Sequence, residues 1–314
     1  APPGDGGINY TLVVRRTVLD ALLVDAAVEA GAELREAFSV QDLVGDGDRV
    51  TGVVGRRGAG TRVAERATLV VGADGWRSTV ARLVGAPIYH ELPSLSINAY
   101  SYWSDLPVDG LGLFARPGRF LIAGATHDGL TLVQAVIAPD DEAAFRADID
   151  HAFADTVRAI PALADHFPGA TRQERFRLVT HLPNGFRKPY GPGWALVGDA
   201  GYVKDPVTAQ GMGDAFRDAE TLVDAIDAVL SHGADPVEAF ATYARRRDAA
   251  AAAMYELTAR LARVHEPPPP EMVSVLAAAA ADGQQAERFL GVIAGTVPVD
   301  DVFPPKPAQV GSHS

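Results

Sequence analysis

One segment in the second half of the chain constrains the fold more than any other. A short apolar run, Trp194 to Val197, leads into Gly198-Asp199-Ala200-Gly201, and a long helix is predicted to begin at Gln210-Gly211-Met212-Gly213. Apolar residues then recur at spacings of three and four, as in an amphipathic helix, at Met212, Ala215, Phe216, Ala219, Leu222, Val223, Ile226 and Val229. A buried strand, a glycine-rich turn and a helix in this order indicate an α/β fold.

The residue types in this segment also suggest a ligand. The carboxylate of Asp199 can accept hydrogen bonds from a polyol, and the glycines let backbone approach a flat molecule. The helix N-terminus carries about half a positive charge, which favours an anion in front of it. An anionic, reduced flavin ring would suit this arrangement. Gly-Asp after a strand is by itself a weak signal, because an Asx turn or a helix N-cap explains it. Its combination with the glycine pair and the long helix is much more specific.

Composition excludes several other classes of function. The chain has 28 Lys+Arg and 40 Asp+Glu, a net charge of −12, and its longest basic run is Arg245-Arg246-Arg247. We therefore expect no nucleic-acid and no membrane partner, and no apolar stretch approaches the ~18 residues of a spanning helix. The sequence contains no Cys, which is compatible with a reducing cytoplasm, and we predict that location. The histidines show no metal-ligand spacing, so we expect no metal site.

The first half of the chain reads as a helix followed by short strands. Thr17 and Asp20 resemble a capping box before an amphipathic helix that ends at Gly31. Three apolar runs then predict a three-stranded meander, at residues 40–44, 50–54 and 67–71. The last run enters Gly72-Ala73-Asp74-Gly75, and residues 77–84 look helical.

Between Leu95 and Ala138 the sequence is typical of an antiparallel sheet, because apolar and aromatic residues alternate between glycine and proline breaks. We predict helices at 141–160, 236–264 and 271–294, a strand at 176–180, and a mobile tail at 304–314. A chain of 314 residues is long enough for roughly two domains.

The two glycine-rich turns resemble motifs of the FAD-dependent aromatic hydroxylase family of flavoprotein monooxygenases. The resemblance implies that Asp199, with Gly198 and Ala200, lies at the ribityl chain of FAD. Asp74 and Gly75 correspond to a motif associated with both FAD and the nicotinamide cofactor. The early Arg-x-x-Leu helix opening implies a cofactor contact from Arg16, with Arg15 as the less favoured choice. The loop before the long helix would contact the isoalloxazine through the backbone of Pro206, Gln210, Gly211, Met212 and Gly213.

The same resemblance predicts the fold class and the domains. We expect a mixed α/β protein with a Rossmann-like FAD-binding domain formed by residues 1–93 and 190–265. Residues 94–189 would form an antiparallel substrate-binding sheet domain, and residues 266–314 a C-terminal helical segment with a tail.

The chain departs from the family pattern in two places. The arginine that usually follows Asp74 by seven residues is displaced, since position 81 is Ala and the arginine is Arg82. The family also begins with a βαβ unit carrying Gly-x-Gly-x-x-Gly, whereas the only early glycine cluster, Gly4 to Gly7, precedes an extended stretch. We therefore expect that the first βαβ unit is absent from this chain, that an apolar strand edge is exposed, and that FAD binding and activity are weakened.

The chemistry implied by the resemblance is a monooxygenation of a small aromatic or polyketide-like substrate. NAD(P)H would reduce FAD transiently, and oxygen would form a flavin hydroperoxide. Tyr100, Tyr102 and Trp103 are candidates to line the substrate site, His181 to accept a proton, and Pro206 to position backbone at the flavin. Lys204 and Asp205 either face the flavin or pair with each other at the surface.

Two alternatives stay open. A flavin-dependent reductase of isoprenoid double bonds has a similar Gly-Asp region, whereas a flavin halogenase is disfavoured because the sequence has no Trp-x-Trp-x-Ile-Pro segment. The second open alternative is a non-catalytic fragment that does not bind FAD. A homodimer is compatible with either.

Overall fold

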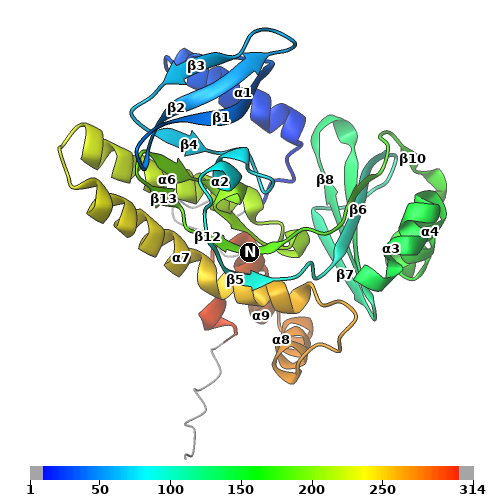
Figure 1. The fold of residues 1–314 in the computed structure, drawn as a ribbon. Helices are drawn as coiled ribbons and strands as arrows, with labels where there is room; N and C mark the ends of the chain where they lie inside the picture. Colours follow the sequence, from blue (N-terminus) through cyan, green and yellow to red (C-terminus); the bar gives the residue numbers. More distant parts are fainter. Residues whose placement is uncertain (1–9, 304–314) are drawn as a thin grey trace, which may run out of the picture.

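The computed structural model describes residues 10–303, and within them the chain forms a mixed α/β fold (Figure 1). The cluster Gly4 to Gly7 and the tail 304–314 lie outside the described residues. In the centre, β4 (Val70–Gly72) and β14 (Trp194–Leu196) pair in parallel, and β13 (Tyr190–Gly191) borders β14. Leu196 is the register partner of Gly72, so both glycine-rich turns leave the same end of the sheet.

A separate sheet stands above this centre in Figure 1. It consists of β1 (Phe38–Asp46), β2 (Arg49–Arg57) and β3 (Val63–Arg66), all antiparallel. The predicted third strand of the meander, 67–71, is wrong: residues 63–66 take that place. Residues 70–72 instead form β4. This strand pairs with β14 and buries Val70 in the same core cluster as Leu196.

The first helix, α1 (Arg16–Glu29), forms without its predicted capping box. Its N-cap is Arg15, without a side-chain cap, and Asp20 binds Arg16 instead, at 2.7 Å. None of its residues is buried, and Leu22 is 63% exposed. Leu23, Val24 and Val28 are exposed as well, so only the first turns of α1, at Val18 and Leu19, are partly covered by other described residues.

The large antiparallel sheet was predicted correctly. It has the order β10-β6-β9-β8-β7, and β11 also pairs with β6. The strands are β6 (Ile97–Ser104), β7 (Leu111–Arg116), β8 (Arg119–Ala125), β9 (Thr131–Ile137), β10 (Thr171–Arg172) and β11 (Arg177–Val179). A third small sheet, β15-β12-β5, connects it to the centre; these strands are β5 (Ile88–Leu92), β12 (Asn184–Arg187) and β15 (Tyr202–Val203).

Three helices cover one face of the large sheet, namely α3 (Glu142–Ala147), α4 (Ile149–Arg158) and α5 (Pro161–Ala164). The single helix predicted for 141–160 is broken at Asp148, whose side chain caps α4 by accepting from the His151 amide at 3.0 Å. Asp282 likewise divides the predicted 271–294 helix into α8 (Pro270–Ala281) and α9 (Gly283–Ala294). In both cases an aspartate N-cap is more favourable than a continuous helix.

The long helices α6 (Gly211–Leu230) and α7 (Pro236–Leu261) pack against each other below the centre. The predicted apolar stripe of α6 is buried only in part. Leu222 is buried, and Ile226 and Val229 pack against the same core cluster. Asp214 and Asp218 are buried as well, whereas Phe216 is 45% and Val223 61% exposed. Between residues 10 and 303, no helix is long and apolar enough to cross a membrane.

Candidate functional site

The turn after β14 presents Asp199 at the carboxyl end of the central sheet. Gly198 has φ +57°, a left-handed conformation that favours glycine. Gly201 is packed so closely that an added Cβ would lie 3.0 Å from Nη1 of Arg247. Asp199 itself is open to solvent, and no described side chain or amide hydrogen-bonds its carboxylate. Partial desolvation raises its pKa, while the positive charges of Arg16 and Lys204 oppose that rise.

The N-terminus of α6 is open beside this carboxylate. Its N-cap, Gln210, makes no side-chain cap, because its amide instead donates to the carbonyls of Val292 and Ile293 in α9. Added Cβ atoms at Gly211 and Gly213 would meet nothing within 4 Å. The loop before it is held by Asp205, which accepts from the Val207 amide at 3.0 Å and caps the short turn starting at Pro206. No described group accepts a hydrogen bond from the amides of residues 211–213, which form the first turn of α6.

The second glycine-rich turn is joined to the first by a residue that no sequence motif indicated. Arg187 donates to the carbonyl of Ala200 and to that of Trp76, each at 2.9 Å. In this turn, Asp74 accepts from Ser78 Oγ at 2.6 Å and from the Thr79 amide at 2.7 Å, so it holds the start of α2 (Thr79–Leu83), whose N-cap is Ser78. Gly75 has φ +76°.

The two arginines before α1 point to different parts of the molecule. Arg16 is close enough to Asp199 and Tyr100 to interact with both electrostatically. Arg15 turns to the large sheet, where it pairs with Glu174 at 2.6 Å and Asp128 at 3.0 Å. Arg16 is therefore the better placed of the two for a ligand at Asp199.

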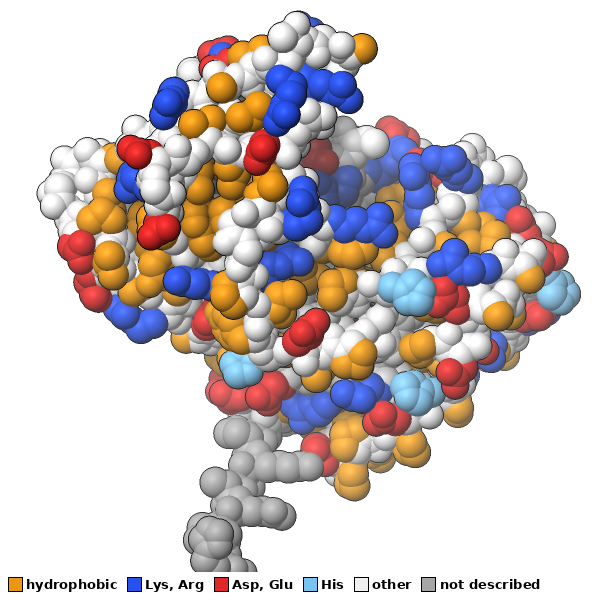
Figure 2. Space-filling model, in the orientation of Figure 1, with side chains coloured by type: hydrophobic (Ala, Val, Ile, Leu, Met, Phe, Trp, Pro, Cys, Tyr) orange, Lys and Arg blue, Asp and Glu red, His pale blue; other side chains and the backbone are white. Residues whose placement is uncertain are grey.

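The large sheet presents a polar and aromatic face on the side opposite its covering helices. Tyr100 and Tyr102 of β6 lie edge to face there, with ring centroids 6.4 Å apart. The expectation that Trp103 lines the same surface is wrong, because neighbouring strand residues point to opposite faces; Trp103 stacks on Phe153 under the helices. Burial raises the pKa of Tyr102, so its hydroxyl stays protonated at neutral pH. Figure 2 shows the surface hollowed between this part and the β1–β3 sheet, with Lys and Arg side chains at the rim.

His181 is placed away from these groups. Its side chain is 75% exposed and pairs with Glu142 of α3 at 3.2 Å. Within the described part of the chain, no group of three His, Asp or Glu side chains could hold a metal ion.

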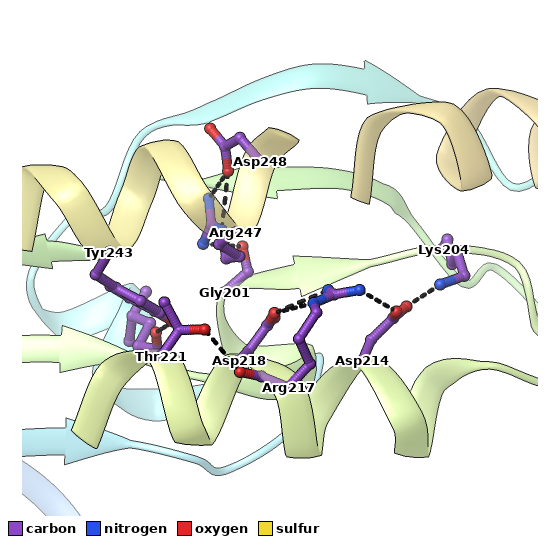
Figure 3. A network of polar contacts seen from close by, with 10 residues as sticks. Gly201, Lys204, Asp214, Arg217, Asp218, Thr221, Tyr243, Arg247 and Asp248 are labelled. Atoms are coloured by element: carbon purple, nitrogen blue, oxygen red, sulfur yellow. Dashed lines mark hydrogen bonds and ion pairs between the residues drawn. The ribbon is translucent and has the colours of Figure 1, made fainter. Parts of the chain in front are cut away.

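A chain of charged side chains, all buried except the half-buried Arg217, lies behind the turn (Figure 3). Lys204 pairs with Asp214, and Arg217 donates to Asp214 at 2.9 Å and to Asp218 at 2.8 Å. Nearby, the fully buried Arg247 of α7 donates to the carbonyl of Gly201 at 3.2 Å. The predicted alternative in which Lys204 and Asp205 pair with each other is wrong: Lys204 binds Asp214, and Asp205 accepts from Ser96 Oγ.

Comparison with known proteins decides the family. A profile described as "FAD binding domain" matches residues 5–258, which is most of the chain. The chain belongs to this FAD-binding family. The predicted resemblance to the FAD-dependent aromatic hydroxylases is thereby confirmed.

Among curated relatives, the FAD-binding chain is 26% identical over 217 residues to digeranylgeranylglycerophospholipid reductase of Methanocella arvoryzae, covering 67% of this chain and 53% of that protein. It is 29% identical over 276 residues to 12-dehydrotetracycline 5-monooxygenase/anhydrotetracycline 6-monooxygenase of Streptomyces rimosus. That match covers 83% of this chain and 53% of the relative. The chain therefore spans about half the length of these relatives. The structure of a myxobacterial chondrochloren halogenase matches with a TM-score of 0.74 at 21% identity, covering 94% of this chain and 69% of that one, which shows a shared fold.

The residues at the two turns fit FAD. The Asp199 carboxylate is available to accept hydrogen bonds from ribityl hydroxyls. Gly211 and Gly213 have no side chains to occupy the space in which a flat ring would lie. The uncapped amides of α6 suit an electron-rich ring edge. Asp199, Arg16 and the 206–213 loop are the groups that would hold it.

Proposed function

We propose that this chain is the FAD-binding and substrate-facing part of a monooxygenase that hydroxylates a small aromatic or polyketide-like molecule, with NAD(P)H as reductant. One observation carries the proposal: the Asp199 carboxylate, to which no described group donates a hydrogen bond, lies beside an uncapped helix N-terminus, and Arg16 is near both Asp199 and Tyr100 of the aromatic sheet face. The tetracycline monooxygenase relative supports the substrate class.

Each group has a proposed task. Bound FAD supplies the redox chemistry that activates oxygen. Asp199 holds the ribityl chain, and the amides from Gly211 to Gly213 stabilise negative charge on the reduced ring. Residues 94–189 would bind the substrate, and Tyr102, as a neutral phenol, would donate a hydrogen bond to a substrate oxygen. Pro206 keeps its proposed role in positioning the loop, whereas His181 is set aside because of its position beside α3.

The alternative is a flavin-dependent reductase of isoprenoid double bonds, which the similarity to the Methanocella reductase favours. To separate the two, we would supply the chain with FAD and NAD(P)H and measure nicotinamide oxidation, oxygen uptake and product mass. Oxygen-coupled oxidation with a product heavier by one oxygen atom supports the monooxygenase. Oxygen-independent saturation of a prenyl chain would replace it with the reductase, and failure to take up FAD would favour a non-catalytic fragment.

A further inference from the structure

A network of four polar side chains connects the loop before α6 to the large sheet. Ser96 Oγ donates to Oδ2 of Asp205 at 2.5 Å, and Nδ2 of Asn98 donates to Ser96 Oγ at 3.0 Å. Nε2 of Gln134, in β9, donates in turn to Oδ1 of Asn98 at 2.8 Å. Asp205, Ser96 and Asn98 are buried, whereas Gln134 is partly exposed. The network therefore begins in the core and ends at an accessible amide.

The carboxylate at one end of the network determines how the amide at the other end is oriented. A carboxylate only accepts hydrogen bonds, so the single hydroxyl proton of Ser96 is directed to Asp205. Ser96 Oγ must then accept from the amide nitrogen of Asn98, which leaves the Asn98 oxygen to accept from the nitrogen of Gln134. Oε1 of Gln134 is the atom that remains at the end of the network.

This oxygen is an acceptor that solvent reaches. No described group donates a hydrogen bond to Oε1 of Gln134. Among the described residues, the buried side-chain nitrogen and oxygen atoms without a partner are only the Tyr202 hydroxyl and Oδ2 of Asp218. Oε1 is therefore not buried, and a bound molecule can donate a hydrogen bond to it.

Gln134 lies on the candidate substrate face, between the loop before α6 and the start of α1. It is the register partner of Tyr100 in β6, so the two side chains share one face of the sheet. Val136 follows two positions later on the same face and belongs to the same core cluster as Val207 in that loop. On the other side, Tyr100 is close enough to Arg16 to interact with it electrostatically.

We propose that Gln134 is a substrate-binding residue that accepts, through Oε1, a hydrogen bond from a hydroxyl group of a phenolic substrate, and that Asn98 is a positioning residue that fixes the orientation of its amide. This inference rests on the proposed function and adds to it the chemistry that the substrate must carry. The network also connects the acceptor to Asp205, which caps the turn starting at Pro206. The substrate hydroxyl would thus be held in a fixed position relative to the loop proposed to contact the flavin.

The inference is tested with two aromatic probes that differ in one proton. Both 1-naphthol and 1-methoxynaphthalene carry an oxygen at the same ring position, but only the naphthol can donate a hydrogen bond. Their dissociation constants are measured on the FAD-loaded chain from the change in the flavin absorption spectrum. We expect the ratio of the ether constant to the naphthol constant to fall about fivefold in Gln134→Met, the effect of one net hydrogen bond. An unchanged ratio in Gln134→Met overturns the inference.

The matched control is Gln173→Met, because Gln173 is exposed and its Nε2 donates to Ser104 Oγ at 2.9 Å. This variant should keep the ratio of the unaltered chain. Asn98→Ala is the second test: it leaves Gln134 in place but removes the partner of its nitrogen, so the ratio should fall by a smaller factor. A merely structural role of Asn98 would weaken both probes equally, and an unchanged ratio would overturn its positioning role.

The outcomes separate this inference from the proposed function. If both probes bind and the ratio does not depend on Gln134, the inference fails while the proposed function stands. If FAD does not bind, or if FAD binds and neither probe changes its spectrum, the proposed function fails and the inference falls with it.

Discussion

Arg247 offers the sharpest test of how the fold holds the Asp199 turn. Its guanidinium is fully buried and donates to four groups: Asp248 at 2.7 Å, the Tyr89 hydroxyl at 2.7 Å, and the carbonyls of Arg187 at 3.1 Å and Gly201 at 3.2 Å. Breaking a buried, hydrogen-bonded ion pair costs about 3–5 kcal/mol. The Asp248 side chain is 36% exposed and can be rehydrated, so we expect Arg247→Met to cost about 3 kcal/mol, at the lower end.

The assay is urea unfolding at pH 7, in which a loss of this size moves the midpoint by about 1 M if the slope is about 3 kcal/mol/M. The control is Arg246→Met, one position earlier in α7, whose side chain is 61% exposed and pairs with Asp224 at the surface. Exposed pairs contribute little, so this variant should stay within about 0.5 kcal/mol of the unaltered chain. Equal losses in the two variants would refute the reasoning that burial gives Arg247 its importance.

Two further predictions concern the residues around the turns. Arg187→Met should weaken FAD binding more than the exposed control Arg245→Met, because only Arg187 ties Ala200 to Trp76; equal FAD affinities by fluorescence titration would contradict this. Burial raises the pKa of Asp205, so the folded state holds this proton more tightly than the unfolded state, and stability falls as pH rises from the unfolded value through the folded one. Asp205→Asn should remove that fall, so its stability relative to the unaltered chain should rise with pH above the unfolded pKa of about 4 in thermal melts; a stability difference independent of pH would be inconsistent with it.

The sequence predicted what local patterns determine. The turn after β14, the long helix after it and the antiparallel sheet were predicted because strand alternation, glycine positions and helical periodicity are local signals. Trp103 could also have been placed correctly, since it follows Tyr102 in one strand and must point to the opposite face.

The buried charges could not be predicted in this way. Hydrophobic periodicity assumes that apolar residues face inward, but Asp214 and Asp218 face inward on α6 because Lys204 and Arg217 meet them there. Lys204 comes from a different element, and this pairing exists only in the folded chain. Arg187 was missed for the same reason, because its partners are backbone carbonyls more than ten residues away in sequence.

The central claim is that Asp199 holds FAD, and the affinity of Asp199→Ala for FAD tests it most directly. Hydrogen bonds to a charged acceptor contribute about 1.5–3 kcal/mol, so the dissociation constant measured by flavin fluorescence should rise at least about tenfold. Asp224→Ala is the matched control, since Asp224 lies on the outer face of α6 with a 68% exposed side chain, and it should bind FAD like the unaltered chain. An Asp199→Ala chain that binds FAD as tightly as the unaltered one would contradict the account.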